Sequence, residues 1–133
     1  MKKLLVYIVF FIAATTTAQE NQVCNEDVKI EKLKLHKENA HASYYHNKFN
    51  GRKTASGRRF DNNKLTAAHK KFPFGTKLKI TNEKNDKSVI VEVIDRGPFV
   101  KGREIDLSKK AFMDITSNKK SGLMYVRIEI LEN

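Results

Sequence analysis

Asp95 and Arg96 are the charged residues whose position best suits them for chemistry. They follow an apolar run, VIVEVI (residues 89–94), that predicts a buried strand, and they precede Gly97-Pro98. Glycine tolerates backbone conformations that other residues resist, whereas proline fixes its own φ and has no amide hydrogen. A carboxylate and a guanidinium would therefore sit on a rigid turn at the end of a strand. The alternative is that Asp95 caps the turn through backbone amides.

Other residues are candidates to bind a ligand near this turn. Asp106 follows a second, shorter apolar step, and it is equally suited to cap a helix expected just after it. Tyr45 could stack on a ligand with its hydroxyl in water, or it could pack inside the protein. His69 could hydrogen-bond a ligand, or its ring could be satisfied inside the protein. For each of these residues the structural role and the functional role stay open.

The sequence predicts no metal and no cofactor. Three of the four histidines, His36, His41 and His46, are spaced by five, which suits neither one face of a helix nor one face of a strand. No cysteine or glutamate cluster with ligand spacing accompanies them. The chain also lacks a glycine-rich phosphate loop and a nucleophile elbow.

The elements that must position the candidate residues are short strands. Alternating or continuous apolar runs predict strands at residues 41–45, 65–68, 77–80, 88–94, 104–106 and 125–131. A long polar loop is expected at 46–63, and a short helix at 107–113 with Asp106 or Ser108 as its N-cap. This pattern predicts an all-β fold, a small β-barrel.

The first 18 residues have the features of a secretory signal peptide. Two lysines precede an apolar stretch, residues 4–14, and small residues at 16–18 offer a cleavage site. An uncleaved anchor is the alternative, but the stretch is short for a membrane span, so no stable membrane insertion is expected after cleavage. The charged residues 19–38 are expected to be a tether, and the domain to span 39–133. The only cysteine, Cys24, is expected to be a free thiol.

The chain is basic, and its positive charge limits the classes of partner that it is expected to bind. It carries 26 Lys and Arg against 15 Asp and Glu, a net charge of +11. Such a surface suits a cell-wall polymer, a membrane surface or nucleic acid, although scattered basic residues can simply be a solvated surface. We expect no nucleic-acid partner, because the sequence shows neither a recognition helix nor an aromatic strand platform.

Three stretches, in order, carry a family resemblance: ASYYHNKFNGRKTASG (42–57), LTAAHKKFPFGTKLKITN (65–82) and VIDRGPFVKGREIDLSKKAF (93–112). Together they resemble the RlpA-like family of secreted bacterial septal-ring lytic transglycosylases. The resemblance implies a six-stranded double-psi β-barrel with one or two short helices. It also implies a location outside the cytoplasm, secreted or in the periplasm or cell envelope, and a monomer.

The chemistry that this resemblance implies is cleavage of the β-1,4 bond between N-acetylmuramic acid and N-acetylglucosamine in peptidoglycan. The C6 hydroxyl of the sugar closes onto C1 and leaves a 1,6-anhydro end, while an acid protonates the departing oxygen. By resemblance Asp95 is the catalytic carboxyl. The residues expected to bind the glycan strand are Tyr45, Thr54, Arg58, His69, Arg96 and Asp106.

Arg58 departs from the family pattern. TASG is usually followed in the family by a glutamate that is thought to be a second catalytic residue, and here Arg58 takes that position. Asp61 matches an aspartate that the family carries in addition to this glutamate. A positioned acid or base contributes about 10²–10⁴-fold to a reaction rate, so loss of this glutamate could leave a slow enzyme or mainly a binder. The alternative function is therefore a noncatalytic peptidoglycan-binding or expansin-like wall-loosening module.

Overall fold

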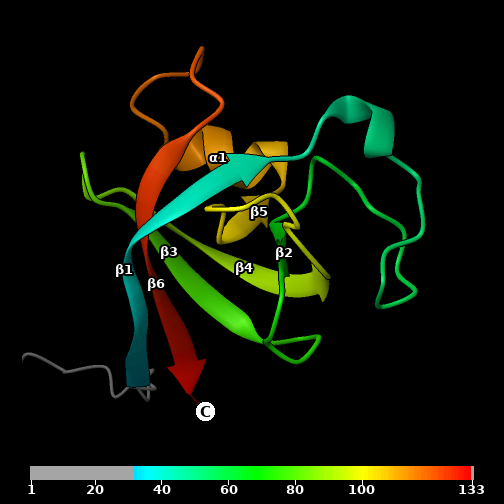
Figure 1. Ribbon diagram of the computed structural model, residues 1–133, viewed down its shortest axis with the longest axis horizontal. Helices are drawn as coiled ribbons and strands as arrows, with labels where there is room; N and C mark the ends of the chain where they lie inside the picture. The colour runs from blue at the N-terminus through cyan, green and yellow to red at the C-terminus, as the bar shows by residue number, and fades with distance from the viewer. Residues whose placement is uncertain (1–31, 133) are drawn as a thin grey trace, which may run out of the picture. The chain divides into compact units, whose positions relative to one another are not determined.

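This computed structural model describes residues 32–132, which contain six strands, one short α-helix and a 3-10 helix at Asn47–Phe49 (Figure 1). The strands close into a barrel in the order β1-β5-β2-β4-β3-β6. Their bounds are β1 Lys32–Tyr44, β2 Thr66–His69, β3 Lys77–Asn82, β4 Ser88–Asp95, β5 Ile105–Leu107 and β6 Met124–Glu132.

Two strand pairs, β1 with β5 and β2 with β4, are parallel, and the other neighbours are antiparallel. Parallel neighbours cannot be joined by a tight hairpin, so the chain must cross over the barrel between them. The long connection after β1 passes β5 to reach β2, and the long connection after β4 passes β2 to reach β5. The all-β, six-stranded double-psi barrel expected from the sequence is confirmed.

The core consists of apolar side chains from every strand. Alternation puts Leu78 and Ile80 of β3 inside, and the neighbouring strand β6 buries Val126 and Ile128 beside them. β4 buries Val91 and Val93 in the same cluster and keeps Glu92 on its outer face. The strands that carry the candidate residues are therefore fixed by packing on one side, which holds their ends in place.

Helix α1, Lys109–Ile115, packs against the barrel through Ala111, Phe112 and Ile115, all fully buried. Its N-cap is Ser108, whose hydroxyl accepts a hydrogen bond from the amide of Ala111. This decides between the two expected caps, and it leaves the carboxylate of Asp106 free for another role. The helix begins two residues later than expected.

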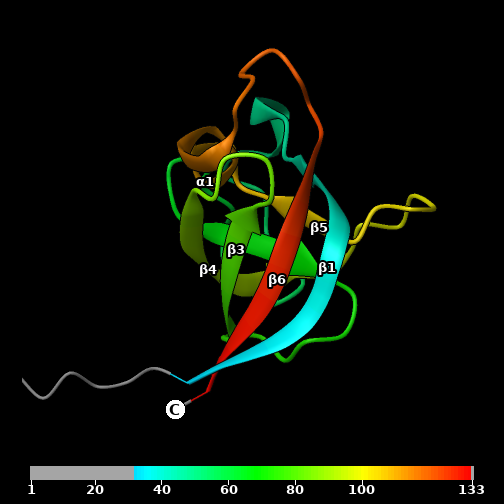
Figure 2. The ribbon, with the colours of Figure 1, turned by 90° about the vertical axis from the view of Figure 1, so that its left-hand side faces the viewer.

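The first strand is longer than expected, so the expected boundary between tether and domain at residue 39 is wrong. β1 begins at Lys32 and runs antiparallel to β6 through two register shifts (Figure 2). Residues 32–39 are exposed, so their side chains give no burial pattern. Backbone hydrogen bonds to β6 hold this part of the strand, and such bonds do not depend on apolar side chains. The expected signal peptide, the tether before residue 32 and Cys24 lie outside the described residues.

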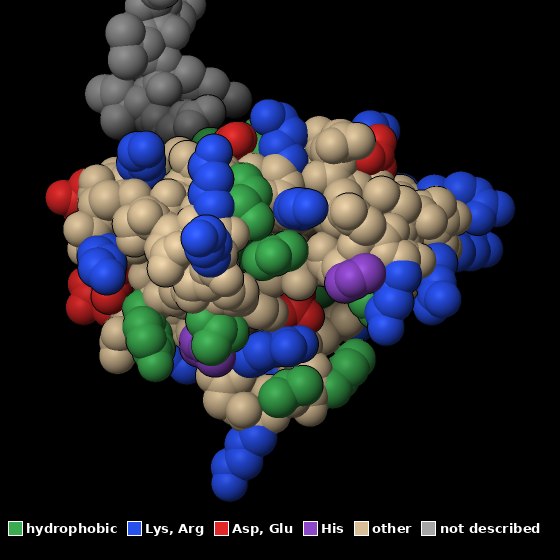
Figure 3. All heavy atoms as spheres, turned by 90° about the horizontal axis from the view of Figure 1, so that it is seen from above, with side chains coloured by type: hydrophobic (Ala, Val, Ile, Leu, Met, Phe, Trp, Pro, Cys, Tyr) green, Lys and Arg blue, Asp and Glu red, His purple; other side chains and the backbone are tan. Residues whose placement is uncertain are grey.

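Among residues 32–132, no helix combines the length and the apolar character needed to cross a membrane. Lys and Arg side chains are spread around the face shown in Figure 3 and do not gather in one patch. This distribution fits the interpretation of the positive charge as a solvated surface.

Candidate active site

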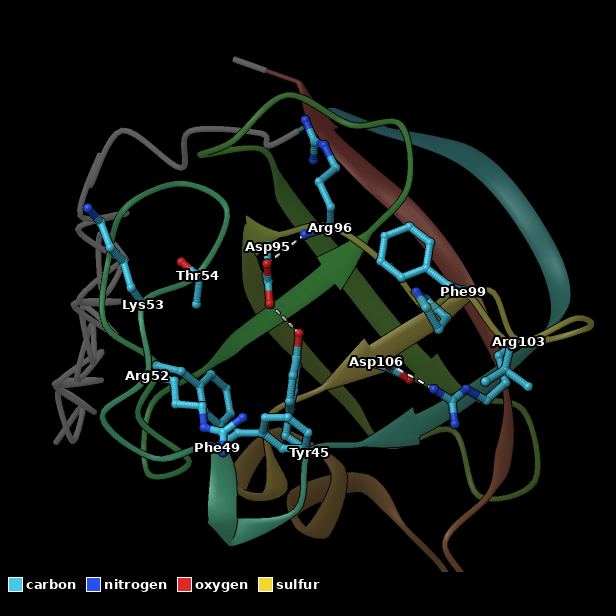
Figure 4. Close-up of a pocket in the computed structure, with 14 residues that line it drawn as sticks. Tyr45, Phe49, Arg52, Lys53, Thr54, Asp95, Arg96, Phe99, Arg103 and Asp106 are labelled. Atoms are coloured by element: carbon cyan, nitrogen blue, oxygen red, sulfur yellow. Dashed lines mark hydrogen bonds and ion pairs between the residues drawn. The ribbon is translucent and has the colours of Figure 1, made fainter.

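A pocket of about 470 Å³ opens where the loop after β1, the end of β4 and the strand β5 meet (Figure 4). Five of the residues selected from the sequence line it: Tyr45, Thr54, Asp95, Arg96 and Asp106. Arg58 and His69 are not part of its lining. The structure thus brings both candidate aspartates into one cavity, although they lie on different strands.

Asp95 is the last residue of β4 and is partly exposed to the pocket. Its Oδ1 accepts hydrogen bonds from the amides of Ala55 and Arg96, both at 2.9 Å. Its Oδ2 accepts one from the hydroxyl of Tyr45 at 2.6 Å. Three donors suit a carboxylate, which only accepts hydrogen bonds. Oδ1 therefore has the turn-capping role, whereas Oδ2 accepts one hydrogen bond from the part of the chain that the structure describes and so keeps a second lone pair for a ligand.

The TASG stretch supplies one of these donors because it folds into a turn against the end of β4. The hydroxyl of Thr54 donates to the carbonyl of Arg58 at 2.7 Å, and the amide of Ser56 donates to the carbonyl of Ile94 at 3.1 Å. Gly57 has a φ of +90°, which residues with a side chain rarely adopt. The turn thus presents the amide of Ala55 to Asp95, and Thr54, expected to bind substrate, also holds this turn.

Tyr45 follows β1 directly, and its ring lies against Phe60, with ring centroids 4.3 Å apart. Burial first, then the hydrogen bond and negative charge of Asp95, raise the pKa of the Tyr45 hydroxyl far above its ordinary value. The charge of Asp106 acts in the same direction. Tyr45 therefore keeps its proton and remains a hydrogen-bond donor to Asp95.

Arg96 points away from its neighbour Asp95 (Figure 4). Its Nη1 donates to the carbonyls of Phe72 at 2.8 Å and His69 at 3.3 Å, and its guanidinium lies 4.0 Å from the centroid of the Phe74 ring. Within residues 32–132 no ion pair joins it to Asp95. Arg96 lines the pocket, but its guanidinium is held by these carbonyls and this ring, while the carboxylate of Asp95 is held by neutral donors.

Asp106, in β5, is the second carboxylate of the pocket. The hydroxyl of Ser43 donates to its Oδ1, and Arg103 Nη2 donates to its Oδ2 at 3.2 Å. Its side chain is 15% exposed, against 29% for Arg103. Because the guanidinium balances its charge, Asp106 is suited to hydrogen-bond a neutral polar ligand.

The pocket contains further residues that the sequence interpretation missed. Its basic members are Arg52, Lys53 and Arg103, and its apolar members include Phe49, Phe99 and Val100. Phe99 is 85% exposed, which is unusual for a phenylalanine. One signal in the sequence could have indicated this apolar part of the lining, namely the apolar residues 98–100 that follow Gly97.

Arg58 forms an ion pair with Glu92 instead of lining the pocket. Its Nη1 lies 2.9 Å from Glu92 Oε1, and Lys77 Nζ lies 3.5 Å from Oε2. The hydrogen bond from Arg58, with the charge of Lys77, lowers the pKa of Glu92. Arg58 therefore has a structural partner that accounts for its position.

His69 is buried, and its ring belongs to a polar cluster outside the pocket. Its Nε2 lies 3.0 Å from Glu104 Oε1, and His36 Nε2 lies 3.5 Å from the same oxygen. Burial, which outweighs the effect of Glu104, lowers the pKa of His69. The hydrogen bonds from His69 and Lys37 overcome the effect of burial on Glu104 and lower its pKa. The cluster therefore holds a neutral His69 beside an ionised Glu104.

These three residues could be considered as metal ligands, since their nitrogen and oxygen atoms lie within 4.8 Å of one another. However, the amide of Lys71 donates to His69 Nδ1 at 3.1 Å, so the proton of the neutral ring resides on Nε2. A neutral histidine that ligates a metal through Nε2 carries its proton on Nδ1 and donates it to another group. His69 has its proton on Nε2, the nitrogen that faces the cluster. The absence of a metal stays a prediction, and the contacts favour a hydrogen-bonded cluster.

Comparison with known proteins gives strong matches. A family model described as "Lytic transglycolase" matches residues 37–128. The endolytic peptidoglycan transglycosylase RlpA of Pasteurella multocida is 52% identical over 91 residues, 68% of this chain and 31% of that protein. The protein of the same name from Rickettsia typhi is 50% identical over 99 residues, 72% of this chain and 31% of that protein. The chain thus spans about a third of the length of these relatives.

Similarity to solved structures supports the fold alone. An apo expansin from Clavibacter michiganensis superposes with a TM-score of 0.57 at 17% sequence identity, over 77% of this chain and 52% of that one. The sequence matches extend over the strands and over the loops around the pocket. The family assignment therefore rests on these matches and not on the structural similarity. The chain belongs to the lytic transglycolase family and is an RlpA-like double-psi β-barrel.

Proposed function

We propose that this protein is a secreted peptidoglycan lytic transglycosylase with Asp95 as its catalytic carboxyl. The observation that carries the proposal is the position of Oδ2 of Asp95, which faces a pocket and retains a lone pair. The names of the relatives, endolytic peptidoglycan transglycosylase, support the same activity. The protein would act as a monomer outside the cytoplasm and would need no metal or cofactor.

The reaction needs only one group that can exchange a proton. Asp95 Oδ2 gives a proton to the O4 atom of N-acetylglucosamine as the bond from C1 to O4 breaks. The same oxygen then takes the proton of the C6 hydroxyl as O6 bonds to C1 of the muramic acid. One bond forms, one breaks, no water is consumed, and the carboxyl group ends as it began. A single carboxyl therefore suffices, so Arg58 in place of the family glutamate does not exclude catalysis.

The remaining pocket residues are proposed to bind the glycan strand. Asp106 and Thr54 offer polar contacts to sugar hydroxyl groups, and Arg96 with Arg103 suits the carboxylates of muramic acid or its peptide. Phe99, exposed at the rim, would pack against the apolar face of a pyranose ring. Arg58 and His69 would act on the substrate only indirectly, through the loops that they support.

The second candidate function is a noncatalytic glycan-binding or wall-loosening module, and the Arg58–Glu92 pair favours it. A positive side chain held on Glu92 cannot replace a second acid or base. This alternative predicts that the protein sediments with peptidoglycan and leaves it intact. The same pocket residues would then bind the strand without reacting.

Release of soluble fragments from purified peptidoglycan separates the two functions. The wild-type protein is expected to release fragments, and Asp95→Asn is expected to release none while it still sediments with the polymer. Asp61→Asn, which changes an aspartate outside the pocket lining, is the matched control and should stay active. If the wild type and Asp95→Asn release equal amounts, Asp95 is not the catalytic residue.

A further inference from the structure

The reacting carboxyl must be held in one orientation, and Tyr45 is the only side chain hydrogen-bonded to Asp95 within the described residues. Oδ1 is occupied by two backbone amides, while the Tyr45 hydroxyl donates to Oδ2. We propose that Tyr45 is a positioning residue that fixes Oδ2 of Asp95 as the oxygen that exchanges protons with the glycan. This inference rests on the proposed function, and it replaces the stacking role expected for Tyr45.

The ring of Tyr45 is held by its surroundings and is not free to stack on a sugar. It lies against Phe60, and Phe49 meets it edge-on with ring centroids 5.6 Å apart. Its amide donates to the carbonyl of Leu107 at 3.0 Å, and its carbonyl accepts from Asn62 Nδ2 at 3.0 Å. Backbone and ring are therefore both anchored, so the hydroxyl has a defined place.

The Tyr45 hydroxyl can keep its hydrogen bond throughout the reaction. An oxygen of a carboxyl group has two lone pairs, and the hydroxyl uses one of them on Oδ2. The exchanged proton can reside on the other lone pair, toward the pocket. The backbone amides on Oδ1 cannot reverse their direction, so that oxygen is unsuited to carry the proton.

Tyr45→Phe tests this role, because it removes the hydroxyl and keeps the ring between its aromatic neighbours. We expect kcat on glycan strands to fall about 10-fold, with KM changed less than twofold, since a donor of this kind acts on the reacting group. Tyr125→Phe, at a tyrosine that is 57% exposed, is the matched control and should match wild type.

A readout independent of activity separates this inference from the proposed function. The carboxyl carbon of Asp95, observed by NMR at one fixed pH, should have a different chemical shift in Tyr45→Phe than in wild type, because Oδ2 loses its hydrogen-bond donor. An unchanged chemical shift, or an unchanged kcat, would overturn the positioning role even if the protein is an active enzyme. A changed chemical shift in a protein that forms no product would support the hydrogen bond and refute the proposed function.

Discussion

Asn62 connects the long loop after β1 to the rest of the barrel, and its removal should destabilise both the fold and the site. The residue is 3% exposed, and its side chain makes three hydrogen bonds. Its Nδ2 donates to the Tyr45 carbonyl at 3.0 Å and to Asn47 Oδ1 at 2.9 Å, and its Oδ1 accepts from the Lys109 amide at 2.8 Å. Asn62→Ala would break all three at once.

The size of the effect follows from these contacts. A hydrogen bond contributes about 1 kcal/mol net, and a buried group that is left without a partner costs about 1–3 kcal/mol. Three lost bonds should therefore lower the free energy of unfolding by about 3 kcal/mol. For a domain of about 100 residues, each kcal/mol lowers Tm by roughly 4 °C or more, so Tm should fall by at least about 12 °C.

Urea unfolding of the wild type, Asn62→Ala and Asn63→Ala provides the measurement. Asn63 is the matched control, because it is adjacent in the chain, exposed, and its side chain makes no hydrogen bond within the described residues. We expect Asn63→Ala to stay within about 0.5 kcal/mol of the wild type. A loss below about 1 kcal/mol for Asn62→Ala would refute the role of Asn62 as the anchor of this loop.

Three further predictions concern charge and the rim of the pocket. Because the pKa of His69 is lowered from 6.5, the unfolded chain binds a proton that the folded protein does not, so stability should decline as pH falls below about 6.5. Urea unfolding between pH 7.5 and 5 should show a weaker decline for His69→Gln, and equal slopes would contradict this. Arg58→Glu should lower the free energy of unfolding by up to about 1 kcal/mol, because it places a second negative charge beside Glu92. Adding Glu92→Arg should restore the stability, and no recovery in the double variant would argue against the ion pair. Phe99→Ala should weaken sedimentation with peptidoglycan roughly 3- to 10-fold at unchanged Tm, whereas Leu123→Ala should not; equal binding by both variants would exclude Phe99 as a contact.

The barrel could be predicted from the sequence because its strands carry their own signals. Alternation in β3 and β6 and the apolar run of β4 reflect which side chains are buried, and burial leaves a pattern in the sequence. The start of β1 could not be found in this way. Its first residues stay exposed, and their pairing with β6 is a backbone interaction between distant segments.

The site was predictable only in part for a related reason. Asp95 was identified from its place between a buried strand and a rigid turn, a feature of neighbouring residues. The direction of Arg96 depends on carbonyls from the loop after β2, and the partner of Arg58 is a glutamate on β4. The hydrogen bond from Tyr45 to Asp95 likewise joins the loop after β1 to the end of β4. Such contacts are set by the closure of the barrel, which no local pattern reveals.

The central claim is that Asp95 promotes cleavage of glycan strands without water. Digestion of purified strands in water enriched in heavy oxygen, followed by mass spectrometry of the products, tests it most directly. The wild-type protein is expected to produce 1,6-anhydro ends that carry no label, and Asp95→Asn is expected to produce no such ends. Labelled reducing ends, or equal amounts of anhydro product from both proteins, would contradict it.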